Sequence, residues 1–289
     1  MISGCQAYHK TVIRWSFVRW NIRRLALWSS ILRRQQLVVA LDWGMLSVKP
    51  WRLESVIWFC AAQLASLFVG LTIIAVLEKA GFAAFQPPAG SGAVLVGTLA
   101  FQGMTWVWIS LFLRQHRVNW RDAFGLHRTE MSRALLLAVP VVIAFLPLAW
   151  WLQNVSVHVL TKFGWQPENE TAVTVLTNAK ALWLRAYLSV FTVAVAPVAE
   201  EFIFRGMLYP FLKQCGWPRL AWFGVSFAFA LIHWDAAAFV PLFLLALMLT
   251  WLYEKTDTLL APIMGHMLFN FVNLILLLLF QNEFNPGQS

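Results

Sequence analysis

The stretch TLLAPIMGHMLFNFVNLILLLLFQ at residues 258–281 decides the fold, because it contains no Asp, Glu, Lys or Arg. A helix needs about 20 mostly apolar residues to cross the ~30 Å hydrocarbon core of a bilayer, so this stretch predicts a membrane span. Six more apolar stretches predict further spans, at 53–77, 93–113, 134–152, 182 to at least 204, 219–234 and 236–252. The predicted fold is an all-α, polytopic integral membrane helical bundle of about seven transmembrane helices.

The composition supports this class and excludes a water-soluble fold. Hydrophobic residues make up 60% of the 289 residues and charged residues only 12%, about half of the usual share in soluble domains. A soluble fold of this length could not bury so much apolar side chain. Cys5, Cys60 and Cys215 share no C-x-x-C spacing, which excludes a disulfide framework and a cysteine zinc site.

The distribution of basic residues predicts the orientation. Of the 22 Lys and Arg residues, 18 fall in segments on the side of the N-terminus, at 1–52, 114–133, 205–219 and 253–257. Cytoplasmic loops carry such an excess, so the N-terminus is expected in the cytoplasm and the C-terminus outside it. A bacterial inner membrane is the expected location, although an endoplasmic reticulum membrane obeys the same rule. These charges are not interleaved with stacking aromatic residues, which argues against nucleic-acid binding.

Two regions are expected along the chain. Residues 1–50 form a basic, Trp-containing extension that is not a signal peptide, because charges interrupt every apolar stretch. This extension is expected to be amphipathic and on the membrane surface, or disordered, or upstream of a true start at Met45. Residues 51–281 form the membrane-embedded domain, without an internal repeat.

Six polar residues lie well inside the predicted spans, where ionisable groups are costly and are functional candidates. Arg205 follows Glu201 by four residues and Asn270 follows His266 by four, so each pair shares a helix face. At ~1.5 Å per helical residue, the carboxylates, His233 and the His266–Asn270 pair reach similar depth on the cytoplasmic side of the midplane. We therefore predict a shared polar cavity, formed by Glu200, Glu201, Arg205, His233, His266 and Asn270. Asp235 and Asn273 are interpreted as structural.

This set of side chains suits amide hydrolysis. A carboxylate beside an imidazole can deprotonate water, while a second imidazole and an amide can donate hydrogen bonds to the oxyanion of a tetrahedral intermediate. Glu200, His233 and His266 could instead hold a zinc ion with one open position for water. A purely structural bundle and a proton-coupled transporter are weaker alternatives, the latter because transporters often carry repeated halves.

Three motifs in order resemble the CPBP family, which takes its name from CAAX proteases and bacteriocin-processing enzymes and is also called Abi-type. Glu200 to Arg205 matches its EExxxR motif, Phe229 to His233 its FxxxH motif, and His266 to Asn270 its HxxxN motif. The resemblance covers roughly 180–275, with weaker similarity at 120–126.

The resemblance implies a CAAX-protease-like helical membrane fold and a glutamate-dependent endopeptidase. Glu200 and His233 would activate water, His266 and Asn270 would stabilise the oxyanion, and Glu201 and Arg205 would support the site. No cofactor is expected, with zinc as the alternative. The expected partners are the bilayer and a peptide or protein substrate, such as a prenylated C-terminal tail or a peptide leader. A non-catalytic scaffold or bacteriocin-immunity protein remains an alternative.

Overall fold

The computed structural model describes residues 46–86, 90–127, 130–165, 175–176 and 181–280, and every regular element in these ranges is a helix. The predicted extension 1–50 therefore lies outside the described residues except for its last five positions. The elements are α2 (Leu53–Lys79), η1 (Ala83–Phe85), α3 (Ser91–Thr98), η2 (Leu99–Gly103), α4 (Met104–His116), α5 (Trp120–Phe124), α6 (Met131–Lys162), α8 (Leu182–Val190), η4 (Phe191–Val195), α9 (Ala196–Glu201), η5 (Phe202–Leu208), α10 (Tyr209–Gln214), α11 (Pro218–Leu231), α12 (Phe239–Thr256) and α13 (Leu260–Leu279).

The predicted class, an all-α polytopic membrane bundle, is confirmed. Within the described residues, 6 helical stretches are long and apolar enough to cross a bilayer. They are Leu53–Lys79, Ser91–His116, Met131–Lys162, Leu182–Gln214, Phe239–Thr256 and Leu260–Leu279.

The predicted fifth span is the exception. It corresponds to α11, which has 14 residues and is therefore ~21 Å long, less than the ~30 Å of a hydrocarbon core. Helix α11 ends at Leu231, and Trp234 then adopts a left-handed backbone conformation with φ 53°. The prediction that His233 lies within a helical span is therefore wrong, because the apolar pattern continues past the point where the backbone turns. The prediction for 134–152 also ended too early, since α6 extends to Lys162.

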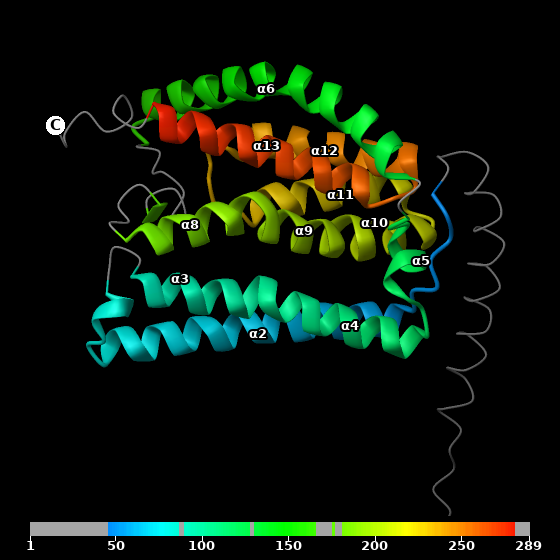
Figure 1. The fold of residues 1–289 in the computed structure, drawn as a ribbon, viewed down its shortest axis with the longest axis horizontal. Coiled ribbons are helices and arrows are strands. Elements are labelled where there is room, and N and C mark those ends of the chain that lie inside the picture. The colour runs from blue at the N-terminus through cyan, green and yellow to red at the C-terminus, as the bar shows by residue number, and fades with distance from the viewer. Residues whose placement is uncertain (1–45, 87–89, 128–129, 166–174, 177–180, 281–289) are drawn as a thin grey trace, which may run out of the picture.

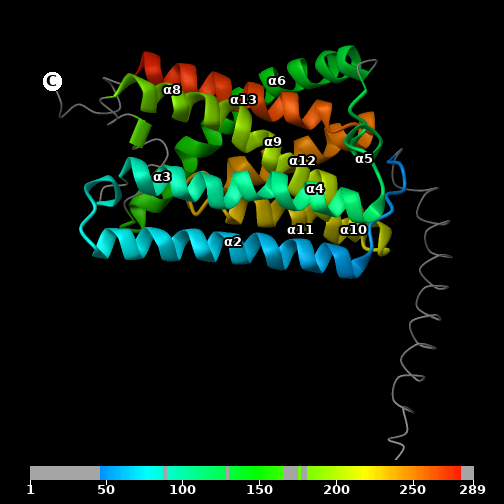
Figure 2. The same ribbon diagram turned by 60° about the horizontal axis from the view of Figure 1, so that its bottom comes forward.

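The stretch α8–α10 lies between two groups of helices (Figure 1). In Figure 1, helices α2, α3 and α4 lie on one side of it and α6 and α13 on the other. The stretch contacts α13 directly, and α6 packs against α12 and α13. In Figure 2, α13 and α6 lie at the top of the bundle and α2 at the bottom. The first residues of α2 and the last residues of α13 lie at opposite ends of the bundle. The short α11 returns the chain between α10 and α12, although it is shorter than a full span.

Three stretches of these helices are π-helical, with i→i+5 hydrogen bonding, which is rare and occurs frequently at functional sites. Segment η2 lies between α3 and α4, whereas η4 and η5 flank α9, which carries the two adjacent glutamates. The EExxxR motif therefore begins in an α-helix and ends in a π-helix. The residue after this motif is Gly206, and a larger residue would not fit there, because its Cβ atom would lie 2.8 Å from the Phe124 ring.

Candidate active site

A buried ion pair forms the base of the site. Arg205 Nη1 donates to Glu201 Oε1 at 2.8 Å, and both side chains are completely buried. The pair is the one that the four-residue spacing predicts. The rest of the guanidinium contacts α12, where Nη2 donates to the Ala246 carbonyl at 2.9 Å and Nε lies 3.4 Å from Thr250 Oγ1. Arg205 also lies over the Phe229 ring, 4.7 Å from its centroid, so it joins three helical segments.

His266 connects the two glutamates. Its Nδ1 lies 2.9 Å from Glu201 Oε1, and its Nε2 lies 3.9 Å from Glu200 Oε2. Because the carboxylate beside Arg205 accepts hydrogen bonds, Nδ1 is the nitrogen that carries the proton. The second nitrogen, Nε2, therefore faces Glu200. Glu200 is 8% exposed and His266 is 2% exposed, so this carboxylate–imidazole–carboxylate series is held almost entirely away from lipid and water.

Asn270 and His233 contact backbone carbonyls. Asn270 Nδ2 donates to the Thr192 carbonyl of η4 at 2.9 Å. An amide nitrogen has two N–H groups, so this bond occupies one of them. His233 Nδ1 lies 2.7 Å from the Phe229 carbonyl oxygen, and since a carbonyl only accepts, Nδ1 carries the proton here too. In a neutral His233 ring, Nε2 is consequently an acceptor.

The structure brings most of the predicted residues together around α9 and α13. Glu200, Glu201, Arg205 and His266 form one connected group. The ring of Phe229 links His233 to it, since its centroid lies 4.8 Å from that of His233 and 5.6 Å from that of His266. His233 thus reaches the group from the turn after α11 and not from within a span.

The two polar residues interpreted as structural make structural contacts. Asp235 Oδ1 accepts from the backbone N–H groups of Ala237 and Ala238, at 2.8 and 2.9 Å, and so stabilises the turn before α12. Asn273 Oδ1 accepts from Trp150 Nε1 at 2.9 Å and joins α13 to α6.

The side chains do not fit a metal site as they stand. Among the described residues, no three His, Cys, Asp or Glu side chains are grouped so that they could hold a metal ion. Glu200, His233 and His266 are thus not arranged as zinc ligands. Zinc dependence stays an alternative for experiment.

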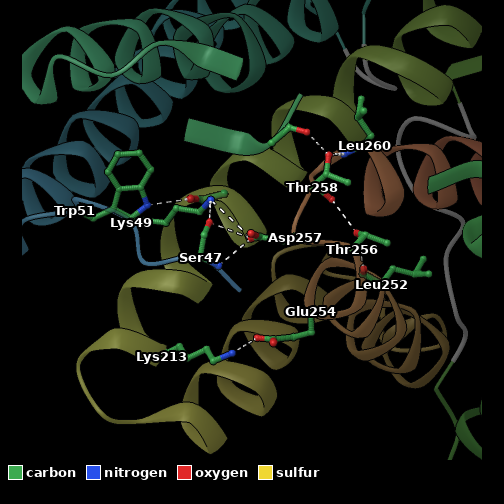
Figure 3. A network of polar contacts seen from close by, with 12 residues as sticks. Ser47, Lys49, Trp51, Lys213, Leu252, Glu254, Thr256, Asp257, Thr258 and Leu260 are labelled. Carbon is green, nitrogen blue, oxygen red and sulfur yellow. Dashed lines mark hydrogen bonds and ion pairs between the residues drawn. The ribbon is translucent and has the colours of Figure 1, made fainter. Parts of the chain in front are cut away.

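A second polar network, which the sequence did not indicate, brings the residues just before α2 near α10 and the end of α12 (Figure 3). Here Glu254 Oε1 accepts from Lys213 Nζ and from the Tyr209 hydroxyl. Nearby, Asp257 Oδ1 accepts from the backbone N–H and the hydroxyl of Ser47. Lys213 and Glu254 are 41 positions apart, so their spacing gives no signal that they pair.

The α12–α13 turn belongs to the same network. Thr258 Oγ1 donates to the Gly125 carbonyl and accepts from the Leu260 N–H. On the other side of the network, Trp51 Nε1 donates to the Gly206 carbonyl at 3.1 Å. The network therefore joins the residues before α2 both to the start of the His266 helix and to the stretch that follows Arg205.

Comparison with known proteins gives independent evidence on the family that this chain resembles. Residues 182–272 match the family model described as Type II CAAX prenyl endopeptidase Rce1-like. This match confirms the resemblance that the three motifs indicated. The chain is also similar to UPF0177 protein YaiF of Lactococcus lactis subsp. lactis (strain IL1403), with 28% identity over 145 residues, which are 49% of this chain and 62% of that protein. The chain thus matches less than two thirds of the length of this relative. No solved structure matches the chain significantly.

Proposed function

We propose that this chain is an intramembrane, glutamate-dependent endopeptidase of the CAAX-protease type. In this proposal Glu200 and His233 activate a water molecule, and His266 and Asn270 stabilise the oxyanion. Glu201 and Arg205 support the site by holding His266 and by balancing charge. The proposal extends the match of 182–272 to the activity of the whole protein.

The observation that carries the proposal is the series Glu201–His266–Glu200 in the interior of the bundle. A purely structural ion pair needs only Glu201 and Arg205, which already balance one another at 2.8 Å. The second carboxylate, 3.9 Å from His266 Nε2, adds a further ionisable group at nearly complete burial. Such a group is costly in a bilayer, and a role in proton transfer accounts for its presence.

The proposed reaction transfers protons without a covalent enzyme intermediate. Glu200, assisted by His233, takes a proton from water as the water oxygen adds to the scissile carbonyl carbon. The resulting oxyanion accepts hydrogen bonds from the second N–H of Asn270 and from His266 when Nε2 is protonated. The proton held by Glu200 then passes to the amide nitrogen, the C–N bond breaks, and the products are a carboxylic acid and an amine.

The substrate is proposed by class only. A membrane-embedded site suits a peptide that is anchored at the bilayer, such as a prenylated C-terminal tail or a peptide leader. We also propose that the N-terminus is cytoplasmic, that the membrane is a bacterial inner membrane, and that 1–50 is an extension of the 51–281 peptidase domain. The charge distribution of the sequence supports this orientation.

A fluorogenic peptide library that includes prenylated tails tests the proposal with purified protein in lipid vesicles. We expect cleavage that is lost in Glu200→Ala and in His233→Ala and is unaffected by EDTA or phenanthroline. Full activity in either variant would contradict the glutamate-dependent mechanism. Loss of cleavage on chelation alone would instead assign the site to zinc chemistry.

A second candidate function is a non-catalytic membrane scaffold or immunity protein. The observation in its favour is that Asn270 on α13 bonds to the Thr192 carbonyl of η4, as residues that join membrane helices do. This function predicts that Glu200→Gln leaves the cellular phenotype intact. Loss of the phenotype at normal protein abundance would count against it.

A further inference from the structure

The three π-helical segments share a feature that the proposed mechanism does not use. Each contains a carbonyl that accepts a hydrogen bond from a side chain on another segment. In η2 the Phe101 carbonyl accepts from Gln63 Nε2 at 2.9 Å, and in η4 the Thr192 carbonyl accepts from Asn270 Nδ2 at 2.9 Å. In η5 the Gly206 carbonyl accepts from Trp51 Nε1 at 3.1 Å.

This recurrence has a physical reason. A π-helical turn replaces i→i+4 pairing by i→i+5 pairing, and where it meets an α-helix it perturbs the backbone hydrogen bonds. In water such a carbonyl can bond to solvent, but in a bilayer it needs a partner from the protein. At Gly206 the need is greater, because the residue four positions on is Pro210, which has no N–H to donate. The Trp51 N–H therefore bonds to a carbonyl that Pro210 leaves without its i+4 donor.

The η5 contact bears directly on the site, because Gly206 follows Arg205. Without the Trp51 donor, the backbone at Gly206 would have to shift to find another partner and would move Arg205 with it. Arg205 and His266 both bond to Glu201 Oε1, so this shift would reach His266. Trp51 itself is well fixed, being 8% exposed and packed edge-on against Phe112 at 5.0 Å. It also lies before the first residue of α2, far along the chain from the three motifs.

We propose that Trp51 is a positioning residue, whose indole N–H bonds to the Gly206 carbonyl, fixes the backbone of η5 beside Arg205, and so sets the arrangement of Arg205, Glu201 and His266. The role in catalysis rests on the proposed endopeptidase function, whereas the contact and its effect on His266 do not.

The test compares two matched substitutions. Trp51→Phe removes the N–H donor and retains an aromatic ring, and Trp108→Phe removes a similar donor, which bonds to Ser66 Oγ at 2.9 Å away from the site. Replacement of Trp51 by benzothienylalanine, which has sulfur in place of the N–H group, preserves the ring shape in case Trp51→Phe folds poorly. For NMR, glycine is labelled with ¹³C at the carbonyl and methionine with ¹⁵N. Only a glycine carbonyl followed by methionine then lies next to a labelled nitrogen, which gives three signals, from the pairs 44–45, 103–104 and 206–207.

We expect both Trp51 variants to move the Gly206 carbonyl signal and leave that of Gly103 in place. We also expect kcat to fall by roughly 10- to 100-fold with unchanged KM, since small displacements of reacting groups have effects of this size. Trp108→Phe should change neither the Gly206 signal nor kcat. A Gly206 signal that does not move overturns the inference, and so does a kcat equal to that of Trp108→Phe.

A readout at His266 separates this inference from the proposed function. If the unaltered protein cleaves no substrate, the endopeptidase proposal fails. The ¹⁵N signals of the His266 imidazole then test, without any activity, whether Trp51 positions His266. Movement of these signals in the Trp51 variants, but not in Trp108→Phe, supports the positioning of His266 by Trp51. Unchanged His266 signals overturn it.

Discussion

Replacement of Arg205 by methionine should destabilise the protein more than any exposed charge substitution. Met has a similar length but lacks the charge and the three donor contacts, to Glu201 at 2.8 Å, to the Ala246 carbonyl at 2.9 Å and to Thr250 at 3.4 Å. It would leave the Glu201 carboxylate completely buried without a counter-charge. Removing one partner of a buried ion pair costs about 3–5 kcal/mol, and we expect a loss in this range.

A double-mutant cycle isolates the ion pair. Glu201→Gln combined with Arg205→Met removes both charges, so the double variant should be more stable than Arg205→Met alone. Unfolding by SDS in mixed micelles, followed by circular dichroism, gives the four free energies of unfolding. Arg133→Met serves as the control, since Arg133 lies 3.9 Å from Glu130 on an exposed surface and should contribute less than about 1 kcal/mol.

Two results would refute the reasoning. One is an Arg205→Met variant that is no less stable than Arg133→Met, which would mean that Glu201 is neutral or solvated without Arg205. The other is strict additivity of the two single changes, because a direct pair in a low-dielectric interior must couple.

Three further predictions concern packing, pH and metal. Gly206→Ala should cost about 1–3 kcal/mol by overpacking against the Phe124 ring, measured by the same unfolding assay, and Phe124→Leu should recover part of the loss. Burial lowers the pKa of Lys49, although the nearby Asp257 opposes this shift, so the unfolded chain binds more protons at Lys49 than the folded protein does. The free energy of unfolding should therefore rise as pH increases through the folded pKa, and Lys49→Met should reduce this rise. Chelators should leave the rate of peptide cleavage unchanged, and restoration of a lost rate by added zinc would disagree with the glutamic mechanism.

The spans could be read from the sequence because a bilayer imposes one length and one composition on every crossing helix. The same rule explains the error at 219–234. Helix α11 ends at Leu231, while apolar residues continue to Ile232. The left-handed conformation of Trp234 and the Asp235 side-chain bonds then form the turn before α12. Hydropathy reports which residues avoid water and not where a backbone turns inside protein.

The site could be predicted in part. The Glu201–Arg205 pair follows from local spacing, which survives the change from α- to π-helical pairing within the motif. The contact of His266 with Glu201 spans 65 positions, and spacing gives the depth of each group but not the direction in which it points across the bundle. The Trp51–Gly206 bond spans 155 positions, so spacing gives no signal of it, although Pro210 leaves the Gly206 carbonyl without its usual helical donor.

The most direct test of the central claim is the rate at which Glu200→Gln cleaves the best substrate of the unaltered protein in lipid vesicles. Glu254→Gln is the matched control, because Glu254 is a buried glutamate (4% exposed) that belongs to the second network. We expect Glu200→Gln to lose cleavage by at least about 100-fold, in line with loss of a general base, while Glu254→Gln retains the rate of the unaltered protein. Equal cleavage by Glu200→Gln and Glu254→Gln would contradict a glutamate-dependent mechanism at this site.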